Sequence, residues 1–110
     1  MRIELLYFDG CPSYETLLPK LRELLANEGI EGEIELCSVE SLEAAEKARF
    51  LGSPTVRIDG KDIDPGAGDR SDYGLKCRLY RSGEETSGLP PEEWIVEAIR
   101  SRADGIKPRR

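Results

Sequence analysis

Cysteine is the residue of this chain best suited to chemistry, and Cys11 stands in the most reactive setting. The 110 residues include three cysteines and no histidine, so histidine-activated nucleophiles and histidine-based zinc sites are excluded. Cys11 lies in the turn Asp9-Gly10-Cys11-Pro12, between an apolar run and a helical pattern. Free N–H groups at a helix start favour thiolate over thiol. We predict that Cys11 is a solvent-accessible nucleophile and that Pro12 fixes the turn; the alternative is a small packing residue.

A partner for Cys11 is missing from the usual place. Three residues further on, where a dithiol motif has its second cysteine, the chain has Tyr14, so the neighbouring thiol that normally resolves a mixed disulfide is absent. Cys77 or Cys37 can take that role if the Cα atoms come within about 7 Å, and Cys77 is favoured because its expected strand returns toward Cys11. Otherwise both are buried core residues. Tyr14 is expected to place its ring on the core face of the helix, or to hold a ligand.

Acidic residues occur next to Cys11 and along the glycine-rich stretch 61–74. A carboxylate two residues before a thiol opposes its ionisation, so we expect Asp9 to shape the Asp-Gly turn, with a proton-shuttle role as the alternative. The later acids lack the spacing of a calcium-binding EF-hand. We expect a solvated loop and no metal site from these residues: Asp59, Asp62, Asp64, Asp69 and Asp72.

The elements expected to position these residues form one α/β domain. Apolar spacing predicts strands at 2–8, 33–39, 55–58 and 75–81, and helices at 13–27, 41–50 and from 90 to about 102. Ile34 and Leu36 are expected to point inward from the second strand. The order β-α-β-α-β-β-α gives a four-stranded mixed sheet, strand order 2-1-3-4, with helices on both faces. Right-handed crossovers are expected to make the first three strands parallel and a hairpin to add the fourth antiparallel. The domain is predicted to cover 1–102, followed by a short basic tail at 103–110.

The charge and composition of the chain limit the classes of partner that we expect. A net charge of −6 argues against nucleic acid as the main partner. No apolar run approaches the roughly 20 residues that span a bilayer, so no membrane partner is expected. The first residues read as a core strand rather than a signal peptide. The absence of a signal-peptide pattern and the odd number of cysteines favour a cytoplasmic protein with reduced thiols. We expect no cofactor.

The chain resembles the thioredoxin/glutaredoxin-like superfamily across residues 2–101. Cys11-Pro12 after a strand, Pro19 within a helix and Ser53-Pro54-Thr55 before a strand carry the resemblance. It is most similar to small bacterial thioredoxin-like proteins with a Phe-Asp-Gly-Cys-Pro turn, some with selenocysteine at the nucleophile and some labelled alkylmercury lyase. The matching stretches are 8–12, 52–55 and 77–80.

This resemblance implies a minimal thioredoxin fold and a substrate site around the nucleophile. It implies a cis bond before Pro54, beside Cys11, with the backbone of Ser53 pairing with an extended substrate. The substrate-binding residues that it implies are Tyr14, Ser53, Pro54 and Thr55.

Three functions remain as alternatives. In the first, the protein is a thiol oxidoreductase whose Cys11 attacks a disulfide or a peroxide, and a low-molecular-weight thiol or Cys77 resolves the product. In the second, Cys11 and Cys77 bind a soft metal ion of the mercury type, or the protein is alkylmercury-lyase-like. In the third, the fold is catalytically silent and binds an extended peptide beside Pro54.

Overall fold

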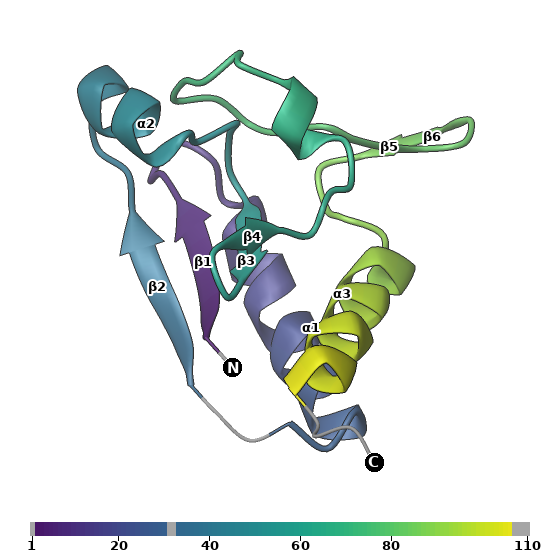
Figure 1. The fold of residues 1–110 in the computed structure, drawn as a ribbon. Coiled ribbons are helices and arrows are strands. Elements are labelled where there is room, and N and C mark those ends of the chain that lie inside the picture. The colour runs from purple at the N-terminus through teal and green to yellow at the C-terminus, as the bar shows by residue number, and fades with distance from the viewer. Residues whose placement is uncertain (1, 31–32, 107–110) are drawn as a thin grey trace.

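A four-stranded mixed sheet of order β2-β1-β3-β4 forms the centre of the molecule, as predicted (Figure 1). The computed structural model describes residues 2–30 and 33–106. The predicted α/β class is confirmed, with these elements in order: β1 (Ile3–Tyr7), α1 (Ser13–Asn27), β2 (Ile34–Ser38), α2 (Leu42–Ala48), β3 (Thr55–Ile58), β4 (Lys61–Asp62), the 3₁₀ turn η1 (Ala67–Asp69), β5 (Tyr80–Ser82), β6 (Glu85–Ser87) and α3 (Glu92–Ile106).

The direction of β3 differs from the prediction. β1 and β2 are parallel, but β3 runs antiparallel to β1, and β4 antiparallel to β3. The reason is the length of α2, which has seven residues and therefore rises only about 10 Å. A five-residue strand spans about 17 Å, so α2 does not carry the chain back to the starting edge of the sheet. β3 consequently begins at the edge where β1 and β2 end.

The predicted fourth strand at 75–81 is also wrong. β4 follows β3 directly through a two-residue turn at Asp59 and Gly60, whose φ angles are +52° and +83°, the backbone that two-residue hairpins require. We call residues 64–89, which link β4 to α3, the strap. It contains η1 and a separate two-stranded sheet, β5–β6, whose second strand lies outside every predicted element.

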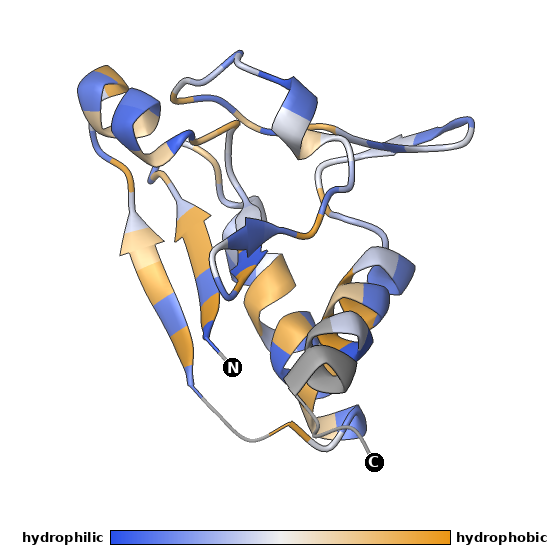
Figure 2. Cartoon of the chain, in the orientation of Figure 1, coloured by the Kyte–Doolittle hydropathy of each residue, from blue (hydrophilic) through white to orange (hydrophobic). Residues whose placement is uncertain are grey.

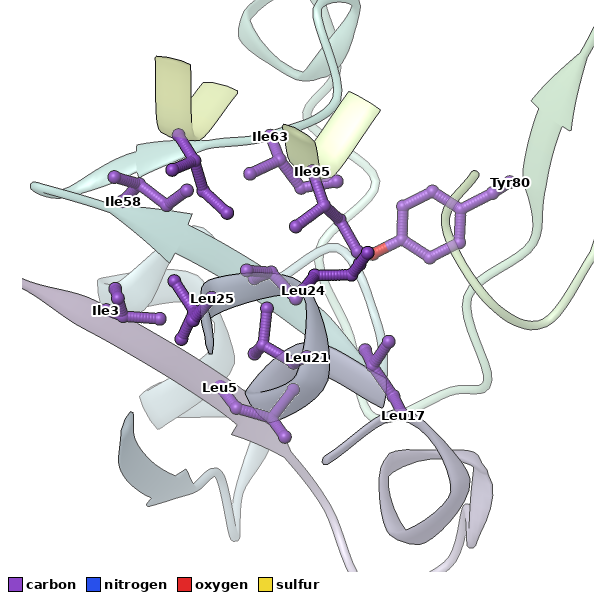
Figure 3. Packing of buried hydrophobic residues seen from close by; sticks show 12 residues of the cluster. Ile3, Leu5, Leu17, Leu21, Leu24, Leu25, Ile58, Ile63, Tyr80 and Ile95 are labelled. Carbon is purple, nitrogen blue, oxygen red and sulfur yellow. The ribbon is translucent and has the colours of Figure 1, made fainter. Parts of the chain in front are cut away.

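Two apolar clusters hold the sheet between helices on both faces. The larger cluster packs β1 and β3 against α1 and α3 and includes Leu5, Leu21 and Ile95; Figure 3 shows Leu5 facing the α1 leucines. The smaller one joins Leu6 to Phe50 beside α2. Adjacent residues Leu5 and Leu6 thus serve opposite faces, as strand geometry requires.

The edges and ends of the fold depart from the sequence pattern. Leu36 was expected to point inward, but β2 is an edge strand and Leu36 is 49% exposed. The last helix continues to Ile106, past the expected end near 102, and the rest of the predicted tail lies outside the described residues. Among the helices in the described part of the chain, none has the length and apolar composition needed to cross a bilayer.

Candidate active site at Cys11 and Cys77

Cys11 is placed by the turn that leaves β1 and by the start of α1. Asp9 and Gly10 form the turn, as predicted, and the Cys11 N–H donates to the Phe8 carbonyl at 3.2 Å. Pro12 is the N-cap of α1 and makes no side-chain hydrogen bond to the helix. The Glu15 N–H donates to the Pro12 carbonyl at 2.9 Å. No side-chain cap competes for the N–H groups of Ser13 and Tyr14, which can therefore serve an acceptor beside them. The Cys11 sulfur lies beside this turn, 3.8 Å from the Ser13 hydroxyl oxygen.

Cys77 is the residue that the structure brings to Cys11. The two form a disulfide across 66 positions of sequence, with Cα atoms 5.6 Å apart, so the predicted approach of Cys77 is confirmed. The prediction of a solvent-accessible Cys11 is wrong for this disulfide-bonded form: Cys11 is 1% exposed, with the Ser53 carbonyl oxygen 3.6 Å from its sulfur. Cys77 is the exposed half of the pair.

The strap is hydrogen-bonded to the segment that precedes β3. Ser53 and Cys77 form an isolated parallel bridge, in which the Ser53 N–H donates to Lys76 at 2.8 Å and the Ser53 carbonyl accepts from Arg78 at 2.8 Å. The Ser53–Pro54 bond is cis, as expected. The resemblance implied that an extended substrate pairs with Ser53; here the protein's own strap occupies that place.

Gly52 permits this close approach. Its φ is +126°, and a Cβ built on it would lie 2.9 Å from the Lys76 carbonyl oxygen and 3.0 Å from the Arg78 Cβ. A larger residue would both strain the backbone and push the strap outward. The seam between Gly52-Ser53 and residues 76–78 is therefore built for backbone-to-backbone contact.

Arg78, which the sequence analysis did not single out, anchors the strap beside Cys77. It is 1% exposed, and its guanidinium donates to Asp62 at 2.8 Å, to Asp64 at 3.2 Å and to Thr55 Oγ1 at 3.1 Å. The same guanidinium lies 4.5 Å from the centre of the Tyr80 ring. Burial lowers the pKa of Arg78, but Tyr80, Asp62 and Asp64 more than offset this, so its pKa is raised and its charge is secure.

Tyr80 connects the strap to the main core. Its ring belongs to the larger apolar cluster, and Figure 3 shows it reaching that cluster from the side of the strap. Its hydroxyl donates to the Pro54 carbonyl oxygen, and burial raises its pKa far above the ordinary value. A neutral tyrosine is thus fixed directly behind the Ser53–Cys77 seam.

The predicted acidic loop is partly an anchoring device. The side chains of Asp62 and Asp64 are only 14% exposed and pair with Arg78, so the expectation of solvated acids is wrong for these two. Asp72 accepts hydrogen bonds from Arg70 and Lys76. A signal was present in the sequence, since carboxylates two apart at 62 and 64 suit a two-sided contact with one arginine, but their partner lies 16 and 14 residues further on.

The other predicted site residues have local roles in this form. Tyr14 is half-buried and stacks on Tyr7, with ring centres 4.1 Å apart. Pro54 and Thr55 are buried, and the Thr55 hydroxyl donates to the Gly52 carbonyl at 2.7 Å. Contact of these residues with a substrate stays a prediction, and Pro54 and Thr55 lie beneath the strap, bonded to Tyr80 and Arg78.

Cys37 is not part of the pair. It remains a free thiol on β2, 3.9 Å from a Glu4 carboxylate oxygen, and burial raises its pKa. Glu4, Glu35 and Cys37 place possible metal-ligand atoms within 4.8 Å of one another, but Arg2 already pairs with both carboxylates. We therefore interpret Glu4 and Glu35 as the partners of Arg2 in a surface ion-pair cluster.

No protein-family model, curated protein or solved structure matches this chain significantly. The chemistry of the site therefore has to be read from its geometry. Two cysteines meet at a helix start, one buried and one exposed, and an ion-paired arginine holds the exposed one in place. Such an arrangement can store and release two electrons as a disulfide and a dithiol.

Proposed function

We propose that this protein is a thioredoxin-like thiol–disulfide oxidoreductase whose reactive pair is Cys11 and Cys77. The observation that carries the proposal is the disulfide between two cysteines that are 66 positions apart in sequence and 5.6 Å apart at Cα. Cys77 then replaces the resolving cysteine that Tyr14 displaces from the usual motif.

The helix start supports Cys11 as the sulfur that ionises first in the reduced protein. The Ser13 hydroxyl, 3.8 Å away, and the uncapped first turn of α1 can all donate to a thiolate. Each such donor lowers the pKa of a thiol and improves it as a nucleophile and as a leaving group near neutral pH.

The reaction balances as two exchanges. The Cys11 thiolate attacks one sulfur of a substrate disulfide, forms a mixed disulfide and expels the other half as a thiolate. The Cys77 thiolate then attacks Cys11, and the substrate's remaining sulfur leaves while the Cys11–Cys77 bond forms. The substrate gains two electrons and the protein dithiol loses them. With a peroxide, the Cys11 thiolate breaks the O–O bond, takes one oxygen to become a sulfenic acid and releases an alcohol or water; the Cys77 thiolate then attacks Cys11, and the sulfenic oxygen leaves as water with a proton from solvent.

The strap has to move during this cycle. Cys11 is buried beneath Cys77 and Ser53 in the oxidised form, so a bulky substrate reaches it only after the disulfide opens and residues 76–78 lift from Ser53. Two backbone hydrogen bonds hold this seam, each with a net contribution of about 1 kcal/mol. The ion pairs of the buried Arg78 with Asp62 and Asp64 hold the same segment in addition, so they too have to loosen when it lifts.

Single cysteine variants test the proposal. The reduced protein is mixed with 2-hydroxyethyl disulfide, and thiol release is followed with each of Cys11→Ser, Cys77→Ser and Cys37→Ser. We expect Cys11→Ser to fall to the uncatalysed rate and Cys77→Ser to accumulate a mixed disulfide on Cys11. The matched control, Cys37→Ser, keeps the parent rate. An unchanged rate in Cys11→Ser would refute the proposal.

The convergence of the two sulfurs also favours a second function, binding of a soft metal ion by the reduced pair. Thiolates are the ligands that soft ions prefer, and the exposed Cys77 gives an ion a path of entry. We expect the reduced protein to take up one tight equivalent of mercuric ion, and either Cys11→Ser or Cys77→Ser to lose it. Retention of that equivalent in both variants would place the metal elsewhere.

A further inference from the structure

A cationic hollow lies beside Cys77, the exposed residue of the disulfide. Its volume is about 580 Å³, and Cys77 lies on its wall together with four cations and one carboxylate: Arg70, Lys76, Arg78, Arg81 and Asp64. The chain as a whole carries a net charge of −6. A local excess of positive charge on an acidic protein concentrates small anions at that place.

These cations differ in how fully they are neutralised. Arg78 is buried and paired with Asp62 and Asp64, although its Nε has no hydrogen-bond partner among the described residues. Arg70 and Lys76 share a single carboxylate, Asp72. Together these groups leave the hollow with unbalanced positive charge.

Arg81 is the cation most available to a ligand. It lies on β5, is exposed, and makes no ion pair with any residue that the structure describes. Leu79, which is 62% exposed, and Leu51 add an apolar surface to the same hollow. An organic anion of small size suits such a wall better than an inorganic ion.

We propose that the hollow is the entry site for the reductant, and that the reductant is an anionic low-molecular-weight thiol that attacks Cys77. This inference rests on the proposed redox function and identifies the substrate class for its reductive half. The reason for attack at Cys77 is access, since Cys77 is exposed whereas Cys11 is 1% exposed.

The exchange is balanced as follows. The small thiolate forms a bond to the Cys77 sulfur, and the Cys11–Cys77 bond breaks with Cys11 leaving as a thiolate beside the start of α1. A second small thiolate attacks the first small molecule's sulfur, forms the small-molecule disulfide and releases Cys77. Two small thiols lose two electrons, the protein gains them, and the two protons of the small thiols end on the cysteines.

Three probe thiols of different charge test the preference: mercaptoacetate, 2-mercaptoethanol and cysteamine. The rate at which each opens the protein disulfide is measured at low salt and divided by its rate with 2-hydroxyethyl disulfide, which removes differences in thiol reactivity. We expect mercaptoacetate to be about fivefold faster than 2-mercaptoethanol and cysteamine to be slower, with the differences closing as salt screens the charges.

Reversing the charge of Arg81 tests whether this residue causes the preference for mercaptoacetate. Arg81→Glu should remove the rate advantage of mercaptoacetate over 2-mercaptoethanol. Arg81→Gln should reduce the logarithm of that rate ratio by half. The matched control is Arg22→Glu, an equal charge change at an exposed site of α1, and it should retain the advantage. Peptide mapping after a brief, acid-quenched reaction should find the small thiol on Cys77.

The outcomes separate the two proposals. If none of the three thiols opens the bond in the native protein, the proposed redox function fails and this inference fails with it. If all three open it at equal normalised rates, or if the small thiol is found on Cys11, the redox function stands and the anionic entry site is refuted.

Discussion

The sheet with its helices and the strap are held together in different ways. The sheet is joined to α1 and α3 by an apolar cluster of fully buried side chains such as Leu5, Leu21 and Ile95. The strap is held by one buried arginine, one tyrosine, three backbone hydrogen bonds to residues 50–53 and the disulfide. Figure 2 shows the same contrast as colour, with apolar residues on β1 and the inner faces of the helices and mostly polar residues on the β5–β6 hairpin.

The two cysteines lie on opposite sides of this division. Cys11 belongs to the rigid side, at the start of α1, and Cys77 to the strap. Apolar packing resists partial opening because every contact depends on its neighbours, whereas a few polar contacts can open locally. A reaction that alternately joins and separates two sulfurs suits such a boundary.

Reduction of the disulfide should have the largest effect on stability. The bond closes a loop of 66 residues, and a crosslink of that span stabilises by up to about 4 kcal/mol through loss of entropy in the unfolded chain. Urea unfolding of the oxidised and reduced protein measures the difference, and Cys37→Ser should show the same difference as the parent. Equal stability of the two forms would mean that the strap is fixed without the bond.

A core substitution should weaken the whole molecule and leave the exchange chemistry intact. Leu21→Ala removes a fully buried side chain and should lower the free energy of unfolding by about 3 kcal/mol. Leu42→Ala, at a site 63% exposed, should change it by less than about 0.5 kcal/mol. In both variants, the rate at which a small thiol opens the disulfide of the folded protein should equal that of the parent. If the rate in Leu21→Ala differed from the parent rate, the core and the strap would behave as one cooperative unit.

Loss of Arg78 should affect the strap most. Arg78→Met leaves Asp62 and Asp64 without their shared partner and should cost about 2 to 3 kcal/mol. Hydrogen exchange should accelerate chiefly at residues 76–79 and at Ser53. Arg81→Met, three positions along and exposed, is the control that should leave exchange unchanged. Uniform acceleration over α1 and α3 would contradict a separate anchoring role.

The smallest effect concerns Asp72 and depends on pH. Hydrogen bonds from Arg70 and Lys76 hold the pKa of Asp72 well below its usual range. Its contribution to stability is therefore present above the ordinary pKa of 3.8 and is lost as pH falls through the lower folded-state pKa. Because Asp72 is half exposed, Asp72→Asn should cost less than about 1 kcal/mol at pH 7. The gap between variant and parent in thermal unfolding should shrink in acid, whereas Asp69→Asn should show no gap. A gap that is as large at pH 2 as at pH 7 would rule out the ion pairs as its cause.

The local sequence pattern was sufficient to predict the helix that follows Cys11. Helical spacing and the Gly-Cys-Pro turn predicted α1 from Ser13, and helical spacing also predicted α2, which Ser41 caps by accepting from the Ala44 N–H at 3.0 Å. These features depend on neighbours within four positions, which the sequence displays directly.

The long-range features were not predicted because they depend on contacts between residues far apart in the sequence. The direction of β3 follows from how far α2 carries the chain, and the strand expected at 75–81 contains Cys77 and Arg78, whose partners lie 66 and 14 to 23 positions away. Alternating apolar residues there resembled a strand, but the alternation reflects Arg78 and Tyr80 reaching inward while Cys77 and Leu79 face outward. No local pattern distinguishes a buried arginine that has partners from a solvated one.

A redox titration tests the central claim most directly. The protein is equilibrated with graded mixtures of reduced and oxidised dithiothreitol, quenched, unfolded and labelled at its free thiols, and each cysteine is then quantified by mass spectrometry. Cys11 and Cys77 should lose their label together in one two-electron transition while Cys37 stays labelled throughout. Independent labelling of Cys11 and Cys77 at every ratio would contradict a coupled pair.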